Sequence, residues 1–466
     1  MKRSARKDTM LLVSAIISAF NSERFMRGRL ENLAGQTLFT KGQLEIIVID
    51  SNSPQKEGTI VSEFAARHSS IRYERTEVRE TVYAAWNRGV RLSRGRYIIN
   101  ANSDDRFTPE ALERMAGELD KDRGVHAVYG DWLVTNVEND NTDSPAGKFL
   151  FEYPRFLPPL LFYYQITSHA PMFRRSVFER IGFFQDDMRV FGDREFMFRF
   201  AAAGMTARKI PLIAGLYLER ADSLERSESV AEKEFTTIRE TYFMPENLAR
   251  LFGYQSLPGE KDLAGLYASL GSLGLRFLTW KGSPVSDLPF AAKAFMTALR
   301  LDPGNIEALN NLAVLRCLNS QHEEGLELLS RAENRMSHGI IRFNIAAAQK
   351  RYMDIDRYQW MRGNACPAER RGSPSPNRSQ GRLDNNGGSG SPMVSVIIPT
   401  CNRPGLLAEA VESVREQSFQ DYEIIIVNDG GDDISSALAV CNGDRRIRVI
   451  NGGERRGPAA ARNRGL

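Results

Sequence analysis

Two stretches far apart in the chain carry almost the same sequence, and they constrain the fold more than any other feature. VSAIISAFN at residues 13–21 recurs as VSVIIPTCN at residues 394–402. In both, a short apolar run ends in a polar loop with an asparagine, which is typical of a buried strand followed by a turn. The basic residues 1–7 ahead of the first apolar run resemble the start of a secretory signal. The second copy, however, lies deep inside the chain, where no such signal could act, so the pattern is a structural unit.

A second apolar run follows each copy and extends the pattern. EIIVID at residues 45–50 corresponds to EIIIVN at residues 423–428. Runs without alternation predict strands buried on both faces, as in a parallel sheet. Helical patterns separate these strands, so we expect right-handed crossovers and a Rossmann-like, doubly wound, mostly parallel α/β sheet.

The stretch GRYIINANSDDRF at residues 95–107 joins a buried strand directly to Asn102, Asp104 and Asp105. In open α/β sheets, ligands bind outside the carboxyl ends of the strands. Two adjacent carboxylates there suit a divalent cation that also carries phosphates, although a solvated strand-to-helix turn is the simpler interpretation. The loop of Asp50, Ser51 and Ser53 should end a neighbouring strand at the same edge of the sheet.

Downstream, FGDREFMFR at residues 191–199 places Asp193 at the start of a helix, where the helix dipole stabilises a carboxylate. An N-cap role and a catalytic role are both compatible with this position, and Glu195 is the local rival. A final strand is expected within 212–218, followed by a charged, helical segment over 225–252.

From about residue 261 the sequence predicts helices and no strands. It also repeats itself 34 residues on, with small residues at the expected helix crossings. The repeated positions are Ala291, Ala298, Leu309, Asn310 and Ala313, which return as Gly325, Ala332, Phe343, Asn344 and Ala347.

These patterns predict four parts: an α/β domain over 10–255, a helical region over 256–362, a flexible linker rich in Gly, Ser and Pro over 363–392, and a second α/β domain over 393–466. The second copy stops before any counterpart of Asp104, Asp105 or Asp193. We therefore expect it to be a truncated domain that does not catalyse in this form.

Composition limits the partners. The net charge of +4 over 466 residues, with no dense basic run, argues against nucleic acid. Four scattered cysteines predict a reducing, cytoplasmic compartment. No apolar run reaches the roughly 20 residues of a membrane helix, so we expect at most peripheral contact with the inner face of a membrane.

Five blocks of the sequence follow one another along the first α/β domain, and the first two recur in the second. They are VSAIISAFN with VSVIIPTCN, EIIVIDSNS with EIIIVNDGG, AAWNRGVRLSRGRYIINANSDDRF, MFRRSVFERIGFF and FGDREFMFR. In this order, the blocks resemble the family 2 glycosyltransferases, which have the GT-A fold. The helical region is similar to tetratricopeptide repeats.

The resemblance implies that a sugar moves from a nucleoside diphosphate to an acceptor hydroxyl with inversion. It implies Asp193 as the base, and Asp104 and Asp105 as ligands of Mn or Mg. It further implies that the nucleotide sugar is bound by Asn21, Asp50, Ser51, Ser53, Asn102 and Asp104. The acceptor would be a glycan, a lipid-linked sugar or a protein, in bacterial-type polysaccharide or glycoconjugate synthesis. The helical repeats would bind a protein partner.

Several positions depart from the family pattern. Asn102, Ser51 and Gly192 each stand where the family usually has an acid, and Trp86 replaces a residue that could contact phosphate. An alternative is therefore a catalytically weak, nucleotide-sugar-binding scaffold that acts through its helical repeats. A sugar nucleotidyltransferase fits less well, because the loop SAFNSERF has no glycine to cradle phosphates.

Overall fold

The computed structural model describes residues 11–147, 149–220, 228–275, 278–280, 283–285, 287–354, 357–361, 394–415, 422–435 and 446–453, with the single positions 438, 444, 457, 461 and 464. The chain forms two compact units, Met1–Pro374 and Ser375–Leu466. The boundary expected near residue 255 lies inside the first unit. The predicted linker, 363–392, lies outside the described residues.

The first unit is built on a nine-stranded sheet with the order β3-β2-β1-β4-β8-β6-β9-β5, to which β7 is added by pairing with β6. Strands β3, β2, β1 and β4 are parallel, whereas β8 joins β4 and β6 antiparallel. The strands are β1 (Val13–Ala19), β2 (Leu44–Asp50), β3 (Ile71–Arg75), β4 (Tyr97–Asn100), β5 (Arg106–Phe107), β6 (Ala127–Thr135), β7 (Phe149–Phe151), β8 (Met172–Arg174) and β9 (Ala207–Leu218).

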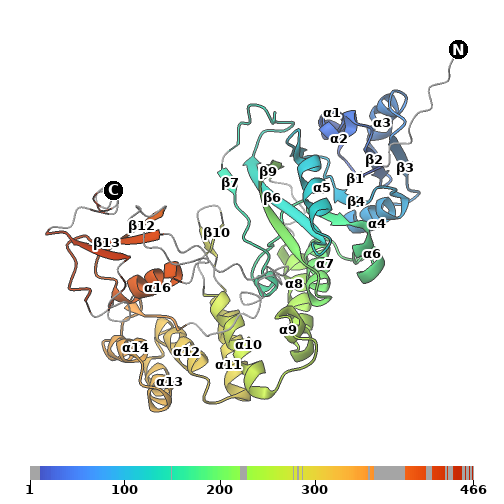
Figure 1. Cartoon of the computed structure of the whole chain (residues 1–466). Helices are drawn as coiled ribbons and strands as arrows, with labels where there is room; N and C mark the ends of the chain where they lie inside the picture. The colour runs from blue at the N-terminus through green and yellow to red at the C-terminus, as the bar shows by residue number, and fades with distance from the viewer. Residues whose placement is uncertain are drawn as a thin grey trace, which may run out of the picture. The chain divides into compact units, whose positions relative to one another are not determined.

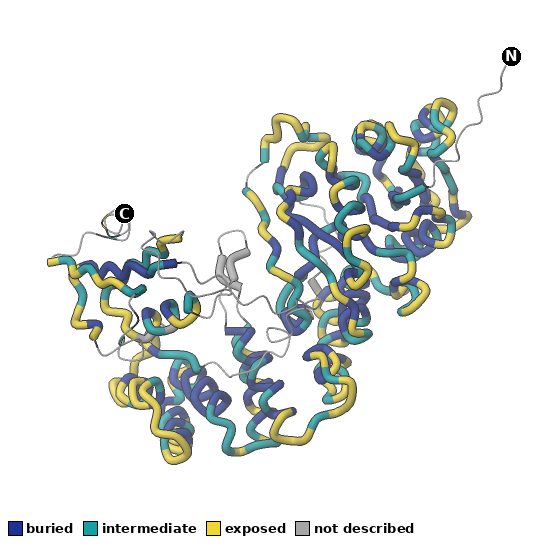
Figure 2. The backbone as a smooth tube through the Cα atoms, viewed as in Figure 1, coloured by how far each residue is buried: buried dark blue, intermediate teal, exposed yellow. Residues whose placement is uncertain are grey.

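Helices cover both faces of this sheet (Figure 1). In the strands, successive side chains point to opposite faces, and the two apolar clusters follow that alternation. Ile17 packs in the cluster of α1, α3 and α5, while Ile16 packs in the cluster of α4 and α7. Burial on both faces explains the unbroken apolar runs (Figure 2). The helices are α1 (Glu23–Ala34), α2 (Thr37–Thr40), α3 (Glu57–Ala65), α4 (Val82–Leu92), α5 (Ala111–Lys121), α6 (Arg175–Ile181) and α7 (Gly192–Ala202).

The strand order reverses beside β1, which places the polar loops together. Ala19 at the end of β1 pairs with Asp50 at the end of β2, and Ile16 pairs with Asn100 at the end of β4. The loops after β1, β2 and β4 therefore leave from one edge of the sheet. In an open α/β sheet, this edge beside the reversal is where ligands bind.

The region after the sheet is helical: α8 (Glu228–Phe243), α9 (Pro245–Leu251), α10 (Glu260–Leu273), α11 (Leu288–Leu301), α12 (Ile306–Leu318), α13 (His322–Arg335) and α14 (Gly339–Gln349). The helix pairs α11–α12 and α13–α14 begin 34 residues apart, which is the period read from the sequence. Among the described residues, no helix combines the length and apolar character that a membrane crossing requires.

The charged segment over 225–252 is helical in its described part. It forms two helices, because Pro245 starts α9 and has no N–H with which to continue α8. One expectation for this region was wrong: the stretch after residue 261 is not purely helical, since β10 (Leu278–Trp280) and β11 (Ser283–Val285) form an antiparallel hairpin.

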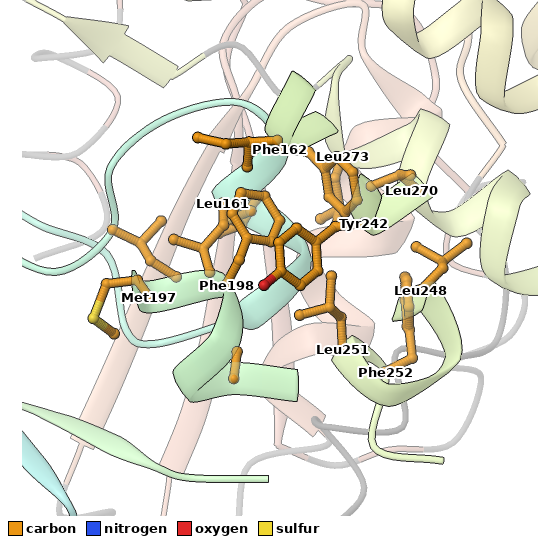
Figure 3. Packing of buried hydrophobic residues seen from close by; sticks show 14 of the residues in the cluster. Leu161, Phe162, Met197, Phe198, Tyr242, Leu248, Leu251, Phe252, Leu270 and Leu273 are labelled. Carbon is orange, nitrogen blue, oxygen red and sulfur yellow. The ribbon is translucent and has the colours of Figure 1, made fainter. Parts of the chain in front are cut away.

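The helices share one apolar core with the sheet region. Figure 3 shows Phe162 of the 3₁₀ helix η1 (Pro158–Phe162) and Phe198 of α7 packed with Tyr242 of α8 and Leu270 of α10. Phe162 also stacks on Phe290 of α11, with ring centroids 5.6 Å apart. The helix that carries Asp193 is thus supported by helices far along the chain.

The second unit repeats the start of the first. Its strands β12 (Val394–Thr400), β13 (Tyr422–Asn428) and β14 (Ile447–Asn451) are parallel, and α16 (Pro404–Arg415) follows β12. Asn21 and Asn402 both have positive φ, at 51° and 52°. The hydrogen bond from Ser14 to Glu45 also recurs, from Ser395 to Glu423. The duplication read from the sequence is a duplication of structure.

Candidate functional site at the carboxyl edge of the sheet

At the end of β2, the side chains of Asp50, Ser51 and Ser53 are buried and hydrogen-bonded. Asp50 accepts hydrogen bonds from Ser53 N at 2.7 Å and from Tyr73 Oη at 2.5 Å. The Ser51 hydroxyl donates to Glu80 O, and the Ser53 hydroxyl donates to Glu57 Oε1 while accepting from Asn21 N. The structure thus brings Asn21, Asp50, Ser51 and Ser53 together, as the sequence predicted.

Two residues that contact this loop, Tyr73 and Arg75, were not predicted from the sequence. Arg75 at the end of β3 pairs in register with Asp50 and forms an ion pair with it, at 2.7 Å. Burial and the hydrogen bond to Asp50 raise the pKa of Tyr73 to about 12, which keeps its hydroxyl protonated. The side chain of Arg75 stays 43% exposed, so it can still contact a ligand. An arginine at the end of the strand next to an acid-terminated strand was the available signal.

The acid pair after β4 is divided between two environments. Asp105 is buried, and its carboxylate accepts from Asn102 Nδ2 at 3.0 Å and from Leu218 N at 3.2 Å. Burial, reinforced by the charge of Asp104, raises the pKa of Asp105 to about 7. Asp104 is partly exposed and pairs with Arg220 at 2.9 Å.

This division bears on metal binding. A search of the described residues finds no group of three or more His, Cys, Asp or Glu side chains that could hold a metal. Asp105 is buried and already accepts two hydrogen bonds, whereas Asp104 is partly exposed and forms an ion pair with Arg220. A divalent cation fits with Asp104 as its protein ligand and the phosphates of a donor as its other ligands, which is how Mg²⁺ is commonly bound.

Asp193 and its rival Glu195 have different partners. Glu195 accepts two hydrogen bonds from Arg199 Nε, at 2.8 and 2.9 Å, in an ion pair along one helix face. Asp193 lies in the first turn of α7, whose N-cap is Phe191, and accepts from Arg194 N and from Tyr83 Oη. Burial raises the pKa of Asp193. Glu195 is held in an ion pair with Arg199, whereas Asp193 receives its hydrogen bonds from a backbone N–H and a phenol, so Asp193 is better placed to accept a proton.

A small cavity adjoins Asp193, and polar atoms without a partner line it. Its lining includes Trp86, Asn100, Gln165, Ser168 and His169. Within the described residues, Trp86 Nε1, Asn100 Oδ1, Gln165 Oε1, Ser168 Oγ and His169 Nε2 are buried and make no hydrogen bond. Buried polar atoms are nearly always paired, so a concentration of orphans in one cavity indicates a polar ligand.

The imidazole of His169 lies against aromatic rings and stacks on Tyr217, with centroids 3.8 Å apart. Removal from water lowers the pKa of His169 to about 3, so the ring is neutral near pH 7.

This burial predicts a dependence of stability on pH. Below about pH 6.5 the unfolded chain binds a proton at His169 that the folded chain does not, so stability should fall as the pH falls toward 3. Going from pH 7 to pH 5 should cost the wild type about 2 kcal/mol more than the His169→Gln variant. Urea unfolding at both pH values measures this difference. The same replacement at His68, a half-buried histidine, is the control. Equal losses in wild type and His169→Gln would contradict the burial.

The parallel half-sheet, its strand-order reversal and the acid-bearing edge define a GT-A α/β domain of the glycosyltransferase class. The sequence profile described as glycosyl transferase family 2 matches residues 14–182 and 395–466, together just over half of the chain. The chain belongs to glycosyl transferase family 2. A tetratricopeptide repeat profile matches residues 294–327, from within α11 to the start of α13.

Curated relatives agree with this assignment. An uncharacterized glycosyltransferase of Rickettsia felis is 49% identical over 74 residues, which are 16% of this chain and 12% of the relative. The uncharacterized glycosyltransferase YwdF of Bacillus subtilis is 26% identical over 205 residues, which are 44% of this chain and 73% of that protein. A PGL/p-HBAD biosynthesis glycosyltransferase of Mycobacterium bovis is 26% identical over 226 residues, 48% and 82% of the two chains. The match to the Rickettsia relative thus spans about an eighth of that protein's length.

Among solved structures, this chain is similar to a mannosyltransferase from Pyrobaculum calidifontis in complex with GDP-Man and Mn²⁺, with 17% sequence identity and a TM-score of 0.37. It covers 70% of this chain and 87% of that one. Staphylococcus aureus TarS in complex with UDP-GlcNAc has 14% identity and a TM-score of 0.39, with coverages of 75% and 89%.

Proposed function

We propose that this protein is an inverting glycosyltransferase that moves a sugar from a nucleoside diphosphate to an acceptor hydroxyl, assisted by a divalent metal. Asp193 is the general base, and the acceptor hydroxyl and the transferred sugar meet beside it. The product belongs to a bacterial-type polysaccharide or glycoconjugate. The name of the mycobacterial relative, a glycosyltransferase of PGL/p-HBAD biosynthesis, supports a biosynthetic role.

The cavity beside Asp193 carries this proposal. It combines a carboxylate of raised pKa with orphaned polar atoms of both kinds: the indole N–H of Trp86 donates, whereas the amide oxygens of Asn100 and Gln165 accept. A hydroxyl group can satisfy donors and acceptors alike. Since unpaired buried polar groups cost free energy, a hydroxyl of a bound sugar that enters the cavity would gain hydrogen bonds there.

The proposed reaction needs one proton transfer and one substitution. Asp193 takes the proton of the acceptor hydroxyl as its oxygen forms a bond to the anomeric carbon. The bond from that carbon to the diphosphate oxygen breaks, and the nucleoside diphosphate leaves with the electron pair. A positioned base of this kind accelerates such a step by about 10²–10⁴-fold. Attack on the face opposite the leaving group inverts the anomeric centre.

The donor would lie along the carboxyl edge of the sheet. The loop of Asp50, Ser51 and Ser53, with Asn21 and the exposed face of Arg75, would position the nucleoside. Asp104 would hold the metal, and Asp105 and Asn102 would fix the loop that presents it. When bound, Mn or Mg would act as a Lewis acid that neutralises the diphosphate.

We expect the Asp104→Asn variant to lose metal-dependent turnover by about 10²-fold, because the metal loses its charged protein ligand. The test is a panel of nucleotide sugars assayed with the purified protein for hydrolysis and transfer, with Mn, with Mg and with chelator. Asp143→Asn, which removes a carboxylate from an exposed loop, is the matched control and should keep full activity.

Turnover that is equally fast with chelator, and unchanged in Asp104→Asn, would reject the role of the metal. Binding of a nucleotide sugar without turnover, across donors and acceptors, would instead favour the scaffold that acts through its helical repeats.

A further inference from the structure

Three asparagines in the helical region are fully buried: Asn310 and Asn311 in α12, and Asn344 in α14. Asparagine is a poor residue for a helix interior, and a buried carboxamide is tolerated only when its donors and acceptor are paired. Their partners therefore explain why they are there. We refer to the three together as the asparagine clamp.

The asparagine clamp holds the main chain of residues 357–361. Asn344 Nδ2 donates to Gln359 O at 2.6 Å, and Asn344 Oδ1 accepts from Gln359 N at 2.8 Å. Asn311 does the same with Met361, where both distances are 2.8 Å. Each carboxamide thus pairs with both main-chain polar groups of one residue.

Other contacts orient the clamp. Asn310 Oδ1 accepts from Asn344 Nδ2 at 2.9 Å, while Asn310 Nδ2 donates to Asn311 Oδ1 at 3.0 Å and to Gln359 O at 3.2 Å. Asn311 Nδ2 also reaches Ser272 Oγ, which donates to Glu307. The carboxamides are therefore held in position by hydrogen bonds besides those to residues 357–361.

The spacing of the held residues is that of an extended strand. Gln359 and Met361 are two residues apart, and in an extended chain alternate residues turn their N–H and C=O groups to the same side. Tyr358, which directly precedes Gln359, supplies a side-chain anchor. It is 5% exposed, packs among apolar residues of α12, α13 and α14, and donates from its hydroxyl to Tyr352 O.

We propose that the asparagine clamp is a binding site for an extended polypeptide strand with an aromatic anchor, and that residues 357–361 are its resident, displaceable occupant. Carboxamides that read only N–H and C=O groups accept almost any sequence, because every residue except proline offers both groups. The aromatic pocket supplies the selectivity. A tethered occupant acts at an effective concentration of about millimolar, so a strand of a partner protein must compete with it.

The test weakens the binding of residues 357–361 and leaves the asparagine clamp unchanged. In the full chain, the double variant Gln359→Pro and Met361→Pro removes both main-chain donors, whereas Gln359→Ala and Met361→Ala keeps them and is the matched control. The probe is a fluorescein-labelled peptide with the sequence of residues 353–363, followed by anisotropy. We expect the proline variant to bind it at least tenfold more tightly than the wild type or the alanine variant.

Adding Asn344→Leu to the proline variant should abolish this binding, and so should replacing the tyrosine of the probe by alanine. A proline variant that keeps the wild-type circular dichroism and melting temperature, but binds no peptide, would overturn the proposal and make the segment a fixed cap.

If the proline variant does not fold, the proposal is tested by hydrogen exchange of the wild-type chain with and without the peptide. Excess unlabelled peptide should increase exchange in residues 357–361 and leave α12 protected. No change at millimolar peptide would overturn the proposal.

Discussion

Replacing Asp193 by asparagine should reduce turnover by about 10²–10⁴-fold and leave the affinity for the donor unchanged, because the proposed base is lost while the edge of the sheet that would hold the nucleotide is intact. Asparagine keeps the size and can still accept from Arg194 N and Tyr83 Oη, so the start of α7 should be preserved. Transfer assays with saturating donor, alongside calorimetric binding of the nucleotide, separate the two effects. Full transfer by the variant would exclude Asp193 as the base.

The pH dependence supplies a further readout of this prediction. Because burial raises the pKa of Asp193, its proton is released at a higher pH than from an ordinary carboxyl. The wild-type rate should therefore fall on the acid side as the pH drops through that raised pKa, and the residual rate of Asp193→Asn should lack this fall. Glu195→Gln is the control on the same helix. It weakens the pair with Arg199 and should affect stability more than turnover.

The second large effect concerns stability. Replacing Phe290 by alanine should lower the free energy of unfolding by about 3–5 kcal/mol, the range for removing a large aromatic side chain from a core. Phe290 stacks on Phe162 and packs edge-on against Tyr163 and Phe243. Because this core continues under α7, the loss should appear around Asp193 and not only in the helical region.

Hydrogen exchange measured by mass spectrometry tests where the loss is felt. We expect faster exchange in residues 158–162 and 192–202 of the Phe290→Ala variant. Met296→Ala, an exposed position on the same helix, is the control and should change stability by less than about 0.5 kcal/mol. Exchange that increases only within α10–α14 would show that the two regions unfold independently.

Much of the sheet could be predicted from the sequence, because its strands are buried on both faces and their apolar runs are therefore continuous. The duplication helped as well, since a pattern that occurs twice is hard to attribute to chance. It placed the loops of Asn21 and Asp50 at strand ends, and the structure has them at one edge. Parallel pairing followed from the alternation of strands and helices.

The environment of each acid could not be predicted, because it depends on residues distant in sequence. The buried carboxylate of Asp105 accepts a hydrogen bond from the backbone N–H of Leu218, and Asp104 forms its ion pair with Arg220. The repeat of Asn310 and Asn344 was visible, yet its purpose was not. Pairing with the main chain of Gln359 requires a segment that has no periodic signal of its own.

The core that joins Phe162 to Phe290 also bears on how such a gene can change. A recombination event between the codons for α9 and α10 would separate the helix carrying Asp193 from side chains that fill the space beside it. Exchange of the repeats for those of another gene would then leave apolar surface uncovered around α7. We therefore expect the transferase sheet and its helices to be inherited as one piece, with changes at Phe162 and Phe290 matched to each other.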